Sequence, residues 1–236
     1  MRIVSDIIDF MFPRYCPICK ERMSQDEQYI CFNCLSDLPR TNAHLIDENP
    51  IEKLYWTHLP IERATSFFFY DSLESRQTIY FTKYFNDPNI GKTIASVMAE
   101  ELQETDFFAG MDMIIPVPLH PKRQRSRGYN QCDFIAEGIS DVTGLPVGKG
   151  IVSRIVDNTS QTHLLSSERK ENVENIFKLM HPERIKGKHL LLVDDVVTTG
   201  STTISCGREL AKAEGVRISV VSMGYAGKKF LNHDNR

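Results

Sequence analysis

From residue 113 onward, the chain alternates short apolar runs with amphipathic stretches, and this alternation limits the possible folds more than any other feature of the sequence. The apolar runs have the length of buried strands, and the stretches between them have the apolar spacing of helices. The expected strands lie at 113–117, 151–156, 189–193 and 217–223, and the expected helices near 129–143, 167–175 and 202–213. Such an alternation predicts an α/β fold with a mostly parallel sheet and flanking helices. Ligands in these folds bind at the carboxyl ends of the strands.

Upstream of this region, the pattern predicts one more strand at 63–70, followed by helical spacing as far as Leu102. The stretch between Cys34 and residue 50 has little periodicity and reads as a linker. We therefore expect a small module with its linker at 1–50 and a main domain at 51–236. The first twelve residues carry acids among their apolar side chains, so they predict a short amphipathic helix and no signal peptide.

Four of the six cysteines form two Cys-x2-Cys pairs, which are Cys16 with Cys19 and Cys31 with Cys34. Two such pairs can bring four thiolates around one tetrahedral zinc ion, and a closed site of this kind is structural. Two disulfides are the alternative, but a cytoplasmic chain would keep them reduced. A redox function is less favoured, because the two pairs flank a short polar hairpin and not a βαβ unit. We expect a structural Zn²⁺ that folds a segment too short to bury its own core.

The composition, with 41% hydrophobic and 25% charged residues, is that of an ordinary folded protein. No apolar stretch approaches the roughly 20 residues that span a bilayer, so we expect no membrane insertion and a cytoplasmic location. The net charge of −3 hides a basic segment at 119–130 that contains no acid. Its cations are Lys122, Arg123, Arg125 and Arg127.

The stretch LLLVDDVVTTGSTT, at residues 190–203, places two carboxylates directly after a buried apolar run. A helix that begins near Ser201 would present unpaired N–H groups, which favour a phosphate, and Gly200 would allow close approach of the backbone. Asp194 and Asp195 would repel a phosphate unless a hydroxylated group lay between them. A ribose with its two vicinal hydroxyls and a 5'-phosphate satisfies both requirements. The alternative is that the two acids only cap a helix.

The sequence lacks the GxxxxGK[ST] and GxGxxG patterns of nucleotide-binding loops. Triphosphate hydrolysis and NAD chemistry are therefore disfavoured.

Residues 190–202 are similar to the motif by which type I phosphoribosyltransferases bind 5-phosphoribosyl 1-pyrophosphate (PRPP). Three further segments extend the resemblance over nearly the whole chain: KYFND at 83–87, IPVPLHPKRQRSRGYNQ at 115–131, and SRIVDNTSQTHLLSSERKENVENIF at 153–177. With the paired cysteines, the chain resembles the ComF family of competence proteins. The RGYNQ element with its PVPL is more specific than the PRPP motif alone.

The resemblance implies a type I phosphoribosyltransferase-like fold, a PRPP site and Mg²⁺ as the partner of the pyrophosphate. By similarity, Asp194 and Asp195 hold the ribose hydroxyls and are the candidate catalytic residues. The implied PRPP-binding residues are Asp194, Asp195, Val197, Thr198, Thr199, Gly200, Ser201 and Thr202. Near the PVPL loop, the candidate pyrophosphate or DNA residues are Arg123, Arg125 and Arg127. The candidate lid residues are Arg154, Gln161, Arg169 and Asn172.

Two functions remain open on these grounds. The first is an accessory protein for uptake of single-stranded DNA in natural competence, working with PRPP or a related phosphosugar and with a competence helicase or ATPase as a further partner. The second is a metabolic phosphoribosyltransferase, amidophosphoribosyltransferase-like or for base salvage, that moves the phosphoribosyl group to an amine or base. For the segment 119–130, pyrophosphate binding, contact with single-stranded DNA and a merely solvated charge run all remain open.

Overall fold

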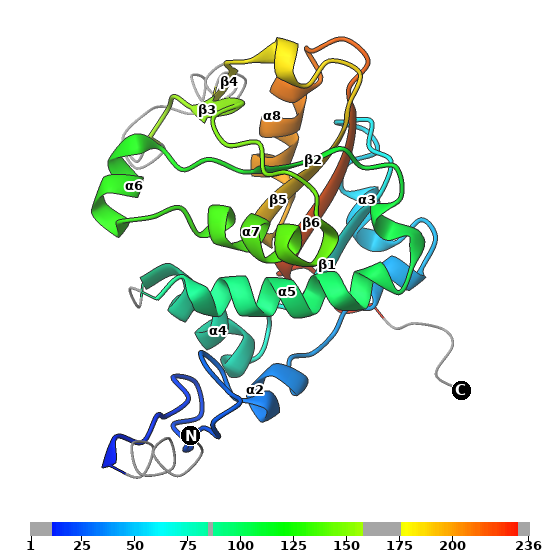
Figure 1. The fold of residues 1–236 in the computed structure, drawn as a ribbon. Coiled ribbons are helices and arrows are strands. Elements are labelled where there is room, and N and C mark those ends of the chain that lie inside the picture. Colours follow the sequence, from blue (N-terminus) through cyan, green and yellow to red (C-terminus); the bar gives the residue numbers. More distant parts are fainter. Residues whose placement is uncertain (1–10, 85–86, 158–175, 231–236) are drawn as a thin grey trace, which may run out of the picture.

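The computed structural model describes residues 11–84, 87–157 and 176–230. Its main sheet has four strands in the order β1-β6-β5-β2, and all neighbouring strands are parallel (Figure 1). The strands are β1 (Ala64–Phe69), β2 (Met113–Pro116), β5 (His189–Val197) and β6 (Arg217–Tyr225). The predicted α/β architecture, with a mostly parallel sheet and flanking helices, is confirmed.

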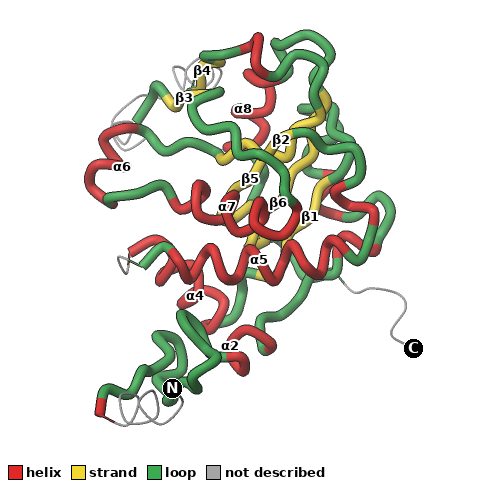
Figure 2. The backbone as a smooth tube through the Cα atoms, viewed as in Figure 1, coloured by secondary structure: helices red, strands yellow, loops and turns green. Residues whose placement is uncertain are grey.

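Helices cover both faces of the sheet, as Figure 2 shows. One face packs on α5 (Asn89–Gln103) and α7 (Gln131–Thr143), and the other packs on α8 (Ser201–Leu210) and on the segment that begins with α3 (Pro50–Lys53). Successive side chains of a strand point to opposite faces. Along β5, Leu191 and Val193 therefore join the core beneath α5 and α7, while Leu190 and Leu192 join the core beneath α8.

The expected strand at 151–156 does not extend the main sheet. Its central residues form β3 (Val152–Arg154), which pairs antiparallel with β4 (Phe177–Leu179) in a separate two-stranded sheet. The open edge of β2 is instead met by Val147, which forms a parallel bridge with Ile114. The helix expected near 167–175 and the amphipathic helix expected before Met11 lie outside the described residues.

The remaining elements are short, apart from α4, and they connect or edge the core. They are α2 (Phe32–Ser36), η1 (Ala43–Leu45), α4 (Leu73–Tyr84), η2 (Asp106–Phe108), α6 (Pro121–Arg127) and η4 (Pro182–Arg184). Among the described residues, no helix has the length and apolar character needed to cross a membrane.

The cysteine-containing segment packs against the α4 and α5 side of the molecule, where Cys16, Ile18 and Cys31 share a hydrophobic cluster with residues of both helices. The chain then runs along the outer edge of β1. The Phe69 N–H donates to the Pro39 carbonyl at 2.8 Å, and the Thr41 N–H donates to the Phe67 carbonyl at 3.0 Å. These bonds occupy an edge that would otherwise be open for pairing with another strand. A domain boundary at residue 50 stays a prediction.

Candidate functional site

The carboxyl end of β5 opens into a loop that leads directly into α8. Gly200 is the N-terminal cap of α8 and has a φ of 74°, a left-handed conformation that other residues adopt only with strain. No side chain caps this helix, so the N–H groups of its first turn remain available for an anion. The loop encloses a small cavity of about 20 Å³. Its lining is Asp194, Val196, Val197, Thr198, Gly200, Ser201, Thr202 and Thr203.

Tyr55 supports this loop from below. The Tyr55 hydroxyl lies 2.9 Å from the Thr203 hydroxyl, which in turn donates to the Gly200 carbonyl at 2.9 Å. Thr203 has one hydroxyl hydrogen and directs it to Gly200, so the Tyr55 hydroxyl is the donor to Thr203. Because the Tyr55 side chain is fully buried, these hydrogen bonds attach the loop at Gly200 to the hydrophobic core.

A second cavity, of about 170 Å³, adjoins the loop on its α6 and α7 side. We call it the cationic cavity, because four of its lining residues are lysine or arginine and only two are aspartate. Its lining is Lys83, Val117, Pro118, Leu119, Arg123, Arg127, Gln131, Cys132, Arg154, Asp194, Asp195, Val196 and Thr202. Asp194, Val196 and Thr202 line both cavities, so a ligand that fills both must pass Asp194.

The two carboxylates are adjacent in β5 and therefore point to opposite faces of the sheet. Asp195 points toward α4 and α7, where its Oδ2 lies 2.8 Å from Lys83 Nζ and 2.7 Å from Gln131 Nε2. Asp194 points toward the α8 face, and its Oδ1 accepts from the Asp195 N–H at 2.9 Å. Burial raises the pKa of Asp194 to about 7, and the charge of Asp195 adds to this rise.

The three predicted arginines do not share one environment. Arg123 and Arg127 line the cationic cavity. Arg123 Nε lies 3.4 Å from an Asp157 oxygen, and Arg127 donates to Gln131 Oε1. Arg125 is not among the lining residues, and its exposed side chain donates to the Pro121 carbonyl at 3.4 Å. The α6 helix therefore directs two of its arginines to the cavity and one to solvent.

Of the predicted lid residues, only Arg154 falls within the described part of the chain, and Gln161, Arg169 and Asn172 lie outside it. Arg154 lines the cationic cavity, where its guanidinium lies 5.6 Å from the centre of the Phe177 ring. Its buried Nε has no hydrogen-bond partner among the described atoms. Burial, and then the nearby Arg123, lower the pKa of Arg154. Both observations indicate that the Arg154 guanidinium is available to bind an anion.

Among the polar side chains that support or border the site, Lys83, Gln131 and Tyr55 were not assigned from the sequence. Lys83 and Gln131 stand in segments that carry the family resemblance, which was the available signal. Tyr55 had no signal of its own. Cys132, in the first turn of α7, is also at the site: it is 1% exposed, and its Sγ lies 3.7 Å from Asp194 Oδ1.

The four N-terminal cysteines come together as predicted. Their sulfur atoms all lie within 4.8 Å of one another, and Cys19 and Cys31 are 3.6 Å apart. A tetrahedral zinc ion with Zn–S bonds of about 2.3 Å separates its sulfurs by about 3.8 Å. The cluster thus has the donor set and the spacing of a four-thiolate metal site.

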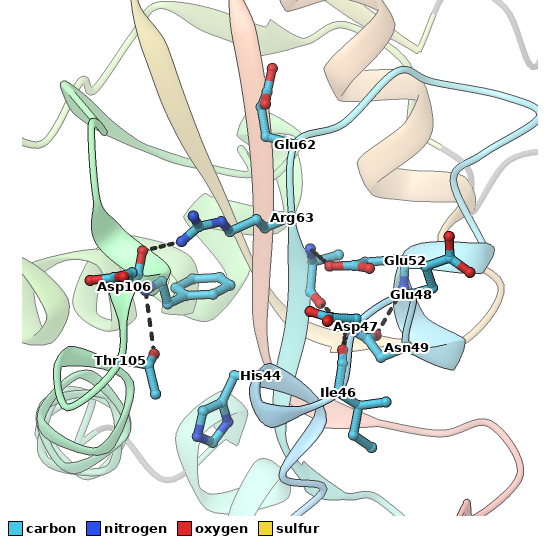
Figure 3. Close-up of a pocket in the computed structure, with 12 residues that line it drawn as sticks. His44, Ile46, Asp47, Glu48, Asn49, Glu52, Glu62, Arg63, Thr105 and Asp106 are labelled. Carbon is cyan, nitrogen blue, oxygen red and sulfur yellow. Dashed lines mark hydrogen bonds between the residues drawn. The ribbon is translucent and has the colours of Figure 1, made fainter.

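A larger cavity, of about 410 Å³, lies near the amino-terminal end of β1 (Figure 3). It is therefore at the opposite end of the parallel strands from the loop that follows β5. Acidic side chains dominate its wall, and Arg63 donates to the Asp106 carbonyl. The carboxylates are Asp47, Glu48, Glu52, Glu62 and Asp106. Because this wall repels a phosphate, size alone does not identify the phosphosugar site.

Comparison with known proteins gives relatives along most of the chain, although no family model matches the sequence. "Competence protein F" of Haemophilus influenzae is 29% identical over 91% of this chain and 86% of its own length. "DNA utilization protein YhgH" of Escherichia coli K12 is 27% identical, covering 87% of each chain. "Competence protein ComFC" of Bacillus subtilis 168 is 22% identical, covering 85% of this chain and 91% of its own.

Solved structures overlap less well. An allosteric regulatory enzyme of purine biosynthesis superposes with a TM-score of 0.40 and 19% identity, covering 60% of this chain and 30% of its own. Adenine phosphoribosyltransferase from Leishmania tarentolae gives a TM-score of 0.37 and 13% identity, covering 80% and 94%. Overlaps at such scores carry no argument about activity. The similarity in sequence, in contrast, extends over most of both chains, and the chain is therefore a homologue of the ComF-type competence proteins, as its motifs predicted.

Proposed function

We propose that the protein binds PRPP at the carboxyl end of β5 and acts as an accessory to the uptake of single-stranded DNA in natural competence. The observation that carries the PRPP site is the pair of cavities that meet at Asp194. The loop cavity offers hydroxyls and helix N–H groups to the 5'-phosphate. The adjoining cationic cavity suits the pyrophosphate, and the ribose would lie between the two, beside Asp194.

Mg²⁺ is the metal that a bound pyrophosphate would bring. This ion keeps several waters and is bound through one or two carboxylates and phosphate oxygens. Asp194 is the carboxylate that borders both cavities, so it is the protein oxygen we assign to the ion. When bound, Mg²⁺ would neutralise charge on the pyrophosphate.

The four-cysteine cluster is proposed to hold a structural Zn²⁺. Four thiolates leave no open coordination position, so the ion would fold the module and take no part in chemistry. In the described part of the module, buried apolar residues such as Ile18, Ile30 and Leu38 share a hydrophobic cluster with α4 and α5. The reduced cysteines that such a site needs also support a cytoplasmic location.

The site could also support phosphoribosyl transfer. In that reaction the bond between C1 and the pyrophosphate oxygen breaks and a nitrogen nucleophile bonds to C1. The cations Arg123, Arg127 and Arg154 would stabilise the departing pyrophosphate, and the loop would keep the ribose in position. The same cavity therefore favours a transferase as a second candidate function, with the acceptor supplied as a free amine or base.

The DNA function is supported by the ComF-type relatives and by one feature of the site. The exposed side chain of Arg125 is not in the cationic cavity, so α6 can offer a cation to a DNA phosphate while Arg123 and Arg127 serve the ligand. Competence would require a partner that moves the strand, and we propose a helicase or ATPase for that step.

Three experiments test this proposal. Calorimetric titration with PRPP and Mg²⁺ should show binding, and Asp194→Asn should weaken it by about 10- to 150-fold, the equivalent of roughly 1.5–3 kcal/mol for a hydrogen bond to a charged group. The absence of binding by the wild-type protein would overturn the PRPP site. In a naturally competent host, deletion of the gene should reduce transformation, and normal transformation by the deletion strain would overturn the DNA function. Release of pyrophosphate with offered amines or bases separates the transferase from the accessory function.

A further inference from the structure

Lys83 reaches the phosphosugar site from outside the PRPP motif. It lies in the last turn of α4, and its Nζ is 2.8 Å from Asp195 Oδ2. Gln131, from the first turn of α7, donates to the same oxygen at 2.7 Å. Two helices that follow different strands in the chain thus hold one carboxylate oxygen of β5.

The other oxygen of Asp195 is also engaged. Its Oδ1 accepts from the Val196 N–H at 2.6 Å, so both oxygens have donors from the protein itself. The Asp195 side chain is 8% exposed, compared with 24% for Lys83. The pair is therefore largely withdrawn from water, where attraction between opposite charges is stronger than at a surface.

The charge arrangement explains why a cation is needed here. Asp194 and Asp195 are neighbours in a buried strand, so two negative charges would repel each other there without a nearby cation. Burial alone would lower the pKa of Lys83, but the Asp195 carboxylate more than offsets it and the pKa is raised. Lys83 thus stays charged beside Asp195. A positive charge thus lies on the α4 side of β5, while Asp194 lines both cavities.

We propose that Lys83 is a positioning residue of the PRPP site, which acts on the sugar through Asp195 and not by contact with the pyrophosphate. The inference rests on the proposed function, because it concerns the same ligand. Lys83, together with Gln131, holds Asp195 in a fixed orientation, and the fixed carboxylate borders the cavity in which the ligand would lie. Since Lys83 also lines the cationic cavity, direct contact with the pyrophosphate is the competing explanation that an experiment must separate.

Two ligands make that separation. PRPP and ribose 5-phosphate share the sugar and the 5'-phosphate, and only PRPP carries the pyrophosphate. Calorimetric titration of the wild type and Lys83→Met with each ligand, in the presence of Mg²⁺, compares the losses. We expect the affinity of Lys83→Met for both ligands to fall by a similar factor, of about tenfold or more. A loss confined to PRPP, or no loss with either ligand, would overturn the proposal.

A double-mutant cycle with Asp195→Asn tests the route of the effect. If Lys83 acts through Asp195, replacing Lys83 should change the ligand affinity little in the Asp195→Asn background. In the background with Asp195 intact, Lys83→Arg should retain part of the affinity that Lys83→Met loses. Independent, additive losses contradict the proposal. Lys92→Met is the matched control, because Lys92 makes a 2.7 Å ion pair with Asp141 away from the site. Its binding of both ligands should equal that of the wild type.

If the wild type binds neither PRPP nor ribose 5-phosphate, the proposed function is refuted. Thermal melting without ligand then tests the Lys83–Asp195 pair on its own. Removing one partner of a buried pair leaves an uncompensated charge, whereas removing both does not. Lys83→Met should therefore melt below the wild type, and adding Asp195→Asn should restore part of the loss. Equal melting of Lys83→Met and the wild type would show that the pair does not position Asp195.

Discussion

Replacing Asp194 with Asn removes a buried acid whose pKa is raised from 3.8 to about 7, first by burial and then by the charge of Asp195. In the unfolded chain the same acid ionises near its ordinary value. Between these two values, the folded protein holds a proton that the unfolded chain has released. The neutral acid therefore stabilises the fold at low pH, and this contribution is lost as the pH rises toward 7. Since one pKa unit is worth about 1.4 kcal/mol, the wild type should lose about 2–3 kcal/mol between pH 5 and pH 8 from this group.

Asn imitates the neutral acid and does not titrate. The two proteins should have similar unfolding free energies below about pH 4, and the stability advantage of Asp194→Asn should grow by about 2–3 kcal/mol between pH 5 and pH 8. Urea unfolding across this range measures the difference, and groups common to both proteins cancel. Asp141→Asn is the control, because Asp141 is 56% exposed and makes its ion pair at the surface. A stability difference that stays constant from pH 5 to pH 8 would refute the raised pKa of Asp194.

Three further predictions concern the loop, the metal and the basic helix. Gly200→Ala places a side chain at a φ of 74° and should cost about 1–2 kcal/mol of stability and weaken PRPP binding, and unchanged affinity in calorimetry would contradict the loop geometry. A strong chelator, or Cys34→Ser, should unfold the N-terminal module while the parallel sheet persists. Limited proteolysis followed by mass spectrometry can detect this local unfolding. Resistance of the module to the protease would count against a metal at the four thiolates. Arg123→Ala should reduce PRPP affinity, whereas Arg125→Ala should leave it unchanged and reduce binding of single-stranded DNA in a filter or anisotropy assay; equal effects of the two on PRPP would refute their separation.

The local features of this protein could be predicted from its sequence because they depend on neighbours in the chain. Strand and helix alternation follows from apolar spacing, and the structure reproduces it at β2, α7, β5, α8 and β6. The paired cysteines are predictable in the same way, since a spacing of two residues within each pair brings the two thiols of that pair close together. The end of β5 was placed too early, at residue 193, because Asp194 and Asp195 interrupt its apolar run, and yet the strand pairs with β6 as far as Val197.

What the tertiary structure alone decided is which side chains meet. The sequence treated Asp194 and Asp195 as equivalent, but strand geometry turns them to opposite faces of the sheet, and only folding brings Lys83 and Gln131 to Asp195. Likewise, a run of arginines does not reveal that α6 sends Arg125 away from the cavity. These outcomes depend on contacts between segments distant in the chain, which no local periodicity records. The sequence by itself determined the elements and the chemistry available at β5, and the packing of α4, α6 and α7 determined which of those groups became a site.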